Sequence, residues 1–194
     1  MIEAELKAHV HDPQDVIKSL DRYGAGHAET YHDTYYDDAT GSLAARDAEL
    51  RVRSVSSPTD QRFVLTYKGA VIDPSSGSKP EHETRVTDPD AVHGLLLGLG
   101  YRPVISYEKR CRNYEFEARE RHLLATLAYL PELDATYLEL ETLLHEGEDV
   151  KAALADVREV LLDLGIKEDD LTTERYTQAV AARRTGQRDG APVG

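Results

Sequence analysis

The sequence predicts an α+β fold: a closed antiparallel β-barrel, or tunnel, of about eight strands with helices packed outside it. Three observations predict this fold. Polar and apolar residues alternate with a period of two over most of the chain. The connections between the alternating stretches are mostly short, which favours antiparallel pairing. The helical segments carry apolar stripes that must cover the apolar faces of the strands, and this leaves the charged faces to line a lumen.

Three helices are predicted from their start and stop signals. Asp12 and Asp88 are suitable N-caps, each followed by a proline, and a glycine follows each helical segment. The predicted helices cover residues 13–23, 89–99 and 149–164, and a short fourth helix covers 173–182.

Eight segments between and beside these helices have the alternation of β-strands. They cover residues 2–8, 30–37, 48–55, 62–69, 81–87, 104–118, 123–130 and 136–144. The stretch 70–80, rich in Ser and Gly, is expected to form a mobile loop over one mouth of the sheet. The tail 183–194 is expected to be disordered, which leaves residues 1–182 as one domain.

The composition limits where the protein works and what it binds. The chain has 194 residues, a net charge of −13 and a single cysteine, Cys111. It has no run of about 20 apolar residues and no signal-peptide pattern, so we expect a cytoplasmic protein without a membrane span. Its acidity should repel nucleic acid. An anionic ligand would therefore need a local basic pocket, a divalent metal, or both.

Charges of the same sign repeat along single strand faces. Residues two apart on a strand point the same way. The aligned sets are Glu3, Glu5 and Lys7; Arg51 and Arg53; Arg62 and Lys68; Glu81, Glu83 and Arg85; and Glu139 and Glu141. For any single strand, a sheet face exposed to solvent is enough to explain the aligned charges. The whole set is harder to explain in that way, because like charges lined up in a sheet repel each other.

Two bound species of opposite charge would relieve this repulsion. A divalent cation would sit among the carboxylates, and an anion would sit among the cations. Oxygen ligands favour Mg²⁺ or Mn²⁺ over zinc. A triphosphate has enough charge to need so many cations, and no Walker motif or other glycine-rich nucleotide loop is present to bind it elsewhere.

Five motifs in order resemble those of a known family. They are the E-x-E-x-K stretch 3–7, the D-T-Y-Y-D stretch 33–37, L-R-V-R at 50–53, L-T-Y-K-G at 65–69 and E-L-E at 139–141. Over residues 2–180 or so, the chain resembles the CYTH superfamily, the triphosphate tunnel metalloenzymes, and within it the class IV adenylate cyclase branch.

The resemblance implies roles for individual residues. It implies metal ligation, by Mg²⁺ or Mn²⁺, at Glu3, Glu5, Glu139 and Glu141, with Glu81 or Glu83 added. It implies phosphate binding at Lys7, Arg51, Arg53 and Lys68, of which Lys7, Arg51 and Arg53 are the catalytic candidates. Lys109 and Arg112 match the family's later basic strand, and Arg85 is a further candidate for substrate binding. Tyr176 is expected to be a packing residue that closes the tunnel.

One departure concerns a carboxylate. The family usually has an Asp about ten residues before the final E-x-E, where this chain has Ala128 and its neighbours. Either Asp134 or Glu132 substitutes for it, or that ligand is missing.

Three functions remain open at this point. The first is an adenylate cyclase that converts ATP to cyclic AMP and pyrophosphate. The second is a metal-dependent triphosphatase acting on inorganic tripolyphosphate, thiamine triphosphate or a nucleotide. The third is a non-catalytic triphosphate-binding protein. The sequence also leaves open whether the chain forms a homodimer.

Overall fold

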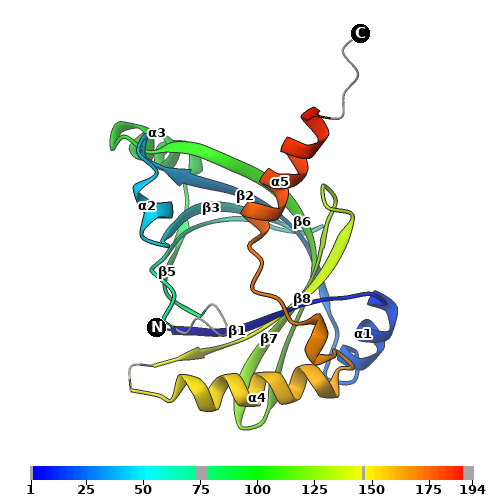
Figure 1. Cartoon of the computed structure of the whole chain (residues 1–194). Helices are drawn as coiled ribbons and strands as arrows, with labels where there is room; N and C mark the ends of the chain where they lie inside the picture. Colours follow the sequence, from blue (N-terminus) through cyan, green and yellow to red (C-terminus); the bar gives the residue numbers. More distant parts are fainter. Residues whose placement is uncertain (1, 73–77, 146, 190–194) are drawn as a thin grey trace.

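The eight strands close into one antiparallel barrel, as predicted (Figure 1). The computed structural model describes residues 2–72, 78–145 and 147–189. The strands are β1 (Ile2–His9), β2 (His27–Asp37), β3 (Glu49–Ser56), β4 (Gln61–Lys68), β5 (Lys79–Val86), β6 (Arg102–Ala118), β7 (Arg121–Leu130) and β8 (Ala135–Leu144). Their order around the barrel is β1-β5-β4-β3-β2-β6-β7-β8.

The barrel is closed by β1, which pairs unequally with its two neighbours. On one side β1 pairs with β8 along its whole length, from Ile2 opposite Leu144 to His9 opposite Tyr137. On the other side it pairs with β5 only through Ile2 opposite Pro80 and Glu3 opposite Lys79. The side chain of Glu3 therefore lies where the sheet closes.

The helices begin where their caps predict. They are α1 (Pro13–Leu20), α2 (Ser42–Ala45), α3 (Pro89–Gly98), α4 (Val150–Asp163), the 3₁₀ turn η1 (Glu168–Asp170) and α5 (Tyr176–Asp189). The Asp12 carboxylate accepts a hydrogen bond from the amide of Gln14 at 3.0 Å, and Asp88 accepts one from Ala91 at 2.9 Å. None of the helices within the described residues is long and apolar enough to cross a membrane.

The predicted C-terminal helix (173–182) and disordered tail (183–194) differ from the structure. Helix α5 begins at Tyr176 and continues to Asp189, so the expected disordered tail is wrong for residues 183–189. The Arg184 guanidinium donates to the Ser106 carbonyl and to Glu132, each at 2.6 Å, and these tertiary contacts stabilise the helix beyond residue 182. Residues 190–194, and residues 73–77 of the expected mobile loop, lie outside the described residues.

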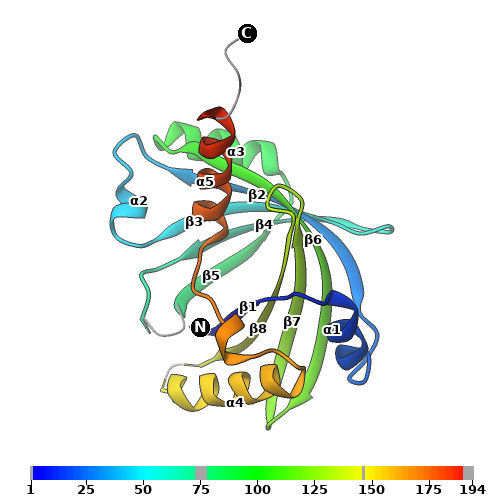
Figure 2. The same cartoon turned by 45° about the vertical axis from the view of Figure 1, so that its right-hand side comes forward.

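The main hydrophobic core lies outside the barrel. Leu6 of β1 and Leu140 of β8 pack beneath α4 with Val157 and Leu161, and α1 adds Leu20. Figures 1 and 2 show α4 running along the outer face of β1, β7 and β8. Because the apolar side chains of these strands face the helices, the charged side chains at alternate positions face inward.

A second apolar cluster lies inside one end of the barrel. Tyr31, Tyr107 and Tyr137 from the strands pack there with Tyr176 and Val180 of α5. In Figure 1 the segment between α4 and α5 crosses in front of the ring of strands. We call residues 172–177 the strap. They fix the start of α5 against the inner face of the barrel.

Candidate functional site

Two cavities form the halves of one tunnel. The strap half, about 380 Å³, is bounded by Tyr35, Tyr107 and the strap. The carboxylate half, about 450 Å³, contains Glu3, Glu141 and Arg53. The residues that line both halves are Glu5, Arg51, Lys68, Lys109 and Glu139. The predicted acidic and basic rows thus converge on one interior space.

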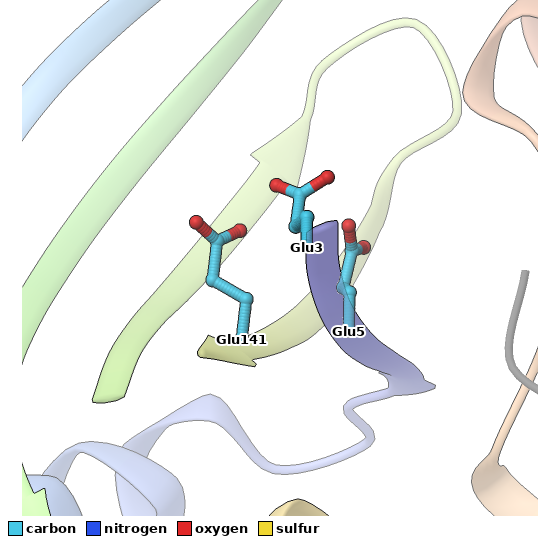
Figure 3. Close-up of side chains that lie close together, drawn as sticks. All are labelled: Glu3, Glu5 and Glu141. Carbon is cyan, nitrogen blue, oxygen red and sulfur yellow. The ribbon is translucent and has the colours of Figure 1, made fainter. Parts of the chain in front are cut away.

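Three carboxylates gather at one place on the tunnel wall. Glu3 and Glu5 come from β1 and Glu141 from β8, where Glu5 lies directly opposite Glu141 in the sheet. One carboxylate oxygen from each lies within 4.8 Å of those of the other two. Figure 3 shows the three side chains pointing to the same side of the two strands. We call this group the carboxylate trio.

The carboxylates of the trio have raised pKa values, which Lys68 opposes only in part. Burial, together with repulsion from Glu3 and Glu139, raises the pKa of Glu5 to about 7. Burial and the charges of Glu3 and Glu5 raise the pKa of Glu141 well above its ordinary value. Burial likewise raises the pKa of Glu3, although Lys68 opposes the shift. A divalent cation among these oxygens would stabilise their charged forms.

Lys68 of β4 connects the trio to β5. Its ammonium contacts Glu3 and lies 3.0 Å from Glu81, while Glu81 is largely buried beside it. The next residue of the β5 row, Glu83, is half exposed and accepts a hydrogen bond from the Thr66 hydroxyl at 3.0 Å. Of these two expected ligands, Glu81 therefore lies nearer the trio, since it shares Lys68 with Glu3.

The two arginines of β3 gather around one buried aspartate. Arg53 donates from Nε and Nη2 to Asp33 at 2.6 and 2.8 Å. Arg51 lies 3.8 Å from the same carboxylate and donates to Thr66 at 3.1 Å. Asp33 is fully buried, but the Arg53 and Arg51 charges outweigh its burial and lower its pKa below the ordinary range. The two guanidinium groups are thus held on the tunnel wall.

Glu139 pairs with a cation and lies outside the trio. Its carboxylate is 3.3 Å from Lys109 of β6. Burial would raise the pKa of Glu139, but the charges of Lys109 and Lys7 outweigh it and lower the pKa to about 2. The expected grouping of Glu139 with the other three glutamates as metal ligands is therefore not what the geometry favours.

Two predicted phosphate-binding residues do not reach the tunnel. Arg112 points to the outer face of β6 and lies 3.2 Å from Asp21. The reason is the strand period: Lys109 faces inward, so residues 110 and 112 face outward. Arg85 shares the parity of Glu81 but is exposed, and it lines neither half of the tunnel.

Neither proposed substitute replaces the missing family aspartate. Asp134 lies on the turn after β7 and accepts a hydrogen bond from Tyr129 at 2.9 Å, and Glu132 pairs with Arg184 at 2.6 Å. From β7, Leu124 and Thr126 line the carboxylate half of the tunnel. Within the described residues, β7 therefore adds no carboxylate to the tunnel.

Sequence reasoning missed several tunnel residues. Asp33 belongs to the D-T-Y-Y-D motif but is not among the predicted site residues, although it shares one strand face with Tyr31 and Tyr35. Lys79 continues the inward row of Glu81 and lies 3.0 Å from Glu49. Arg175 of the strap lies 3.8 Å from Glu49 and also contacts Asp47. Strand alternation could have revealed Asp33. Lys79 begins β5, two residues before the predicted strand and within the stretch 70–80 expected to be a loop, so that expectation is wrong for residues 79–80. Arg175 lies in an irregular segment and gives no such signal.

Comparison with known proteins decides the family. The sequence pattern of the CYTH domain matches residues 1–176. The chain belongs to the CYTH domain family. Members of this family are metalloenzymes that require divalent cations and bind triphosphate substrates.

Similar CYTH proteins differ in their described activities. A Methanocaldococcus jannaschii protein named "Putative adenylate cyclase MJ0240" is 25% identical over 182 residues, which cover 92% of this chain and 98% of that protein. The PH1819 protein of Pyrococcus horikoshii OT3 has a similar structure, with a TM-score of 0.82, 24% identity and coverage of 94% of this chain and 99% of that one. The "Putative adenylyl cyclase HpAC1" from Hippeastrum, described as revealing a dominant triphosphatase activity, has a TM-score of 0.62, 19% identity and 96% coverage of both chains.

Proposed function

We propose that this CYTH protein is a divalent-metal-dependent enzyme of the class IV adenylate cyclase type, which converts ATP to cyclic AMP and pyrophosphate. One observation carries the proposal. A trio of buried carboxylates and a group of buried cations face each other in one tunnel and share its central residues. This arrangement suits a metal-bound triphosphate.

Glu3, Glu5 and Glu141 would hold the metal. Their donor set consists of carboxylate oxygens alone, which suits Mg²⁺ or Mn²⁺. Burial and mutual repulsion raise the pKa values of Glu5 and Glu141 although Lys68 opposes the shift, so a divalent cation would stabilise the charged forms of these carboxylates. A divalent ion in such a site neutralises phosphate charge and polarises a phosphoryl oxygen.

The cations bind and orient the phosphate chain. Arg51 and Arg53 present guanidinium groups whose positions Asp33 fixes, so little further ordering is needed when phosphate oxygens bind. Lys109 is buried on the tunnel wall, and Lys7 lines the strap half. These charges stabilise the negative charge that develops on the leaving pyrophosphate when the ribose 3′-oxygen attacks the α-phosphorus.

The strap half supports a substrate with an organic portion. Beyond the shared cations this cavity is lined by Tyr35, Tyr107 and the hydroxyl side chains of Thr172, Thr173 and Thr177. Aromatic rings and hydroxyl groups are typical partners of a nucleoside. Linear tripolyphosphate has no base or sugar to contact these rings.

A triphosphatase is the second candidate. The structural neighbour from Hippeastrum is described as having a dominant triphosphatase activity. The same carboxylates and cations would serve hydrolysis, in which water attacks the terminal phosphorus and orthophosphate is released. The two reactions differ in the attacking oxygen and not in the residue types that surround the phosphates.

One set of incubations distinguishes these functions. The protein is incubated with ATP, and separately with tripolyphosphate, in the presence of Mg²⁺ or Mn²⁺, and cyclic AMP, pyrophosphate and orthophosphate are measured. Cyclic AMP with equimolar pyrophosphate from ATP supports the cyclase. Orthophosphate without cyclic AMP supports the triphosphatase, with ADP as the second product from ATP and equimolar pyrophosphate as the second product from tripolyphosphate. Tight binding without turnover would indicate a non-catalytic triphosphate-binding protein. The Glu5→Gln variant is the matched control, and it should lose metal-dependent turnover while keeping the fold.

A further inference from the structure

Three cations of the tunnel alternate with two tyrosine rings. The Lys7 ammonium lies 4.4 Å from the centre of the Tyr176 ring, and the Lys109 ammonium lies 4.9 Å from the same centre. Lys109 also lies 5.8 Å from the Tyr31 ring, and the Arg53 guanidinium lies 4.4 Å from that ring. The order through space is therefore Lys7, Tyr176, Lys109, Tyr31, Arg53.

The Tyr176 ring packs against two other tyrosine rings. It meets Tyr137 edge-on with ring centres 5.0 Å apart and Tyr107 edge-on at 6.4 Å. Tyr176 is 7% exposed. Its hydroxyl lies near the Glu139 carboxylate without reaching hydrogen-bond geometry. The ring face, and not the hydroxyl, therefore makes its best-defined polar contacts.

An aromatic ring face can hold a cation in place while leaving its N–H donors free for a ligand. The ring quadrupole attracts a cation without occupying its N–H donors in a strong ion pair. Lys109 and Arg53 also pair with the carboxylates of Glu139 and Asp33, so the contrast with an ion pair concerns Lys7. Within the described residues, Lys7 forms no ion pair with a carboxylate, and its ammonium donates to the strap carbonyl of Glu174. Lys7 thus depends on the strap for its position.

We propose that Tyr176 is a positioning residue: its ring sets the spacing of Lys7 and Lys109 so that both ammonium groups face one phosphate chain. This inference rests on the proposed function and adds a role for the strap. Tyr176 belongs to α5, far along the chain from Lys7, so the C-terminal segment would complete the phosphate site. The role exceeds the packing function that the sequence predicts for Tyr176.

The test compares variants that keep or remove the ring. Tyr176→Phe keeps the ring and removes the hydroxyl, whereas Tyr176→Leu removes the ring. Arg184→Ala is the matched control, because it loosens the same helix by removing the contacts to Glu132 and Ser106 without touching the two lysines. Affinity for tripolyphosphate is measured by calorimetry, and Mn²⁺ affinity and the melting temperature are measured alongside it.

We expect Tyr176→Leu to weaken tripolyphosphate binding by about tenfold, since two cation–π contacts are lost. Tyr176→Phe and Arg184→Ala should stay within about twofold of wild type, and Mn²⁺ affinity should not change in any variant. Equal affinity of Tyr176→Leu and wild type would overturn the inference. So would a loss in Tyr176→Phe as large as that in Tyr176→Leu, or an equal loss in Arg184→Ala.

A measurement without ligand separates this inference from the proposed function. Protons of a lysine side chain held over an aromatic ring resonate upfield. In NMR spectra of the free protein, the terminal methylene protons of Lys7 should be shifted upfield in wild type and Tyr176→Phe but not in Tyr176→Leu. Those of Lys109 should lose only part of their shift in Tyr176→Leu, because the Tyr31 ring remains. Absence of the shift in wild type contradicts the inference whatever the protein binds. A wild-type protein that shows the shift but binds neither ATP nor tripolyphosphate contradicts the proposed function instead.

Discussion

Arg53 and Asp33 form a two-pronged ion pair inside the barrel. Nε and Nη2 of Arg53 donate to the two carboxylate oxygens of Asp33 at 2.6 and 2.8 Å, and the Asp33 side chain is fully buried. Asp33 from β2 lies directly opposite Arg53 of β3 in the sheet. The pair therefore links the strand pairing to the position of a cation that the proposed function assigns to phosphate.

We expect Asp33→Asn to lower the free energy of unfolding at pH 7 by about 3–5 kcal/mol, because it leaves a buried guanidinium without its counter-charge. Urea unfolding measures the change. The matched control is Asp163→Asn, whose carboxylate forms an exposed pair with Arg119 at 3.1 Å. Removal of that pair should cost about 0–1 kcal/mol. Equal costs for the two variants would show that Asp33 and Arg53 contribute no more than a surface pair.

The same pair predicts a pH dependence. The folded-state pKa of Asp33 lies below its value in the unfolded chain, which is about 3.9. Its contribution to stability is therefore fully present above about pH 4 and is lost as the pH falls below that value. The difference in unfolding free energy between wild type and Asp33→Asn should shrink between pH 4 and pH 2. A difference that stays constant over this range would contradict the assignment.

For the metal-free protein, the carboxylate trio predicts a stability that changes with pH in the opposite direction. Burial and the charges of Glu3 and Glu139 raise the folded-state pKa of Glu5 to about 7, above the unfolded value of about 4.3. The protonated trio is favourable at low pH, and this contribution is lost as the pH rises through 7. Metal binding needs the deprotonated form. The rise in melting temperature caused by Mn²⁺ should therefore be larger at pH 8 than at pH 5.5.

Glu5→Gln is the control for other titrating groups. The substitution removes one proposed metal ligand and also the carboxyl group whose pKa is about 7. In this variant the Mn²⁺-induced rise in melting temperature should be small at both pH values. A Mn²⁺ effect in wild type that is independent of pH, or one that survives in Glu5→Gln, would contradict metal binding by the trio.

Packing between α4 and the barrel can be tested with two adjacent leucines. Leu161 is 1% exposed and faces β1 and β8, whereas Leu162 on the same helix is 43% exposed. Leu161→Ala should lower the unfolding free energy by about 2–5 kcal/mol because it leaves a cavity in the outer core. Leu162→Ala should cost less than about 1 kcal/mol. Thermal and urea unfolding measure both, and similar losses would mean that α4 does not pack as described.

Strand alternation was sufficient to place much of the site. It puts Glu3 and Glu5 on one face of β1, and it separates Lys68 from Tyr67 on β4, which is what the structure shows. The helix starts were also predictable, since the Asp caps act through contacts only two or three residues away. These features depend on local geometry that a single stretch of sequence determines.

The remaining features depend on contacts between distant segments. Basic residues occupy both faces of β6, so the inward position of Lys109 and the outward position of Arg112 depend on pairing with β2, where Lys109 lies opposite Tyr31. The placement of Glu139 beside Lys109 depends on the closure of the whole barrel. The strap has no periodic pattern, so the approach of Arg175 to Glu49 could not be predicted from spacing.

Lys109 and Arg112 provide a matched pair on one strand for testing the tunnel as the triphosphate site. Lys109 is 4% exposed and lines both halves of the tunnel, whereas Arg112 lies outside the barrel beside Asp21. Lys109→Met removes a buried charge that the proposed function assigns to phosphate, and it should weaken tripolyphosphate binding by about 2–5 kcal/mol. Arg112→Met also removes one positive charge, so the two variants change the net charge of the protein by the same amount. Calorimetry in the presence of Mn²⁺ should therefore show a large loss of affinity for Lys109→Met and little change for Arg112→Met. If both variants lose affinity alike, the triphosphate responds to the general field of the protein and not to a cation inside the tunnel.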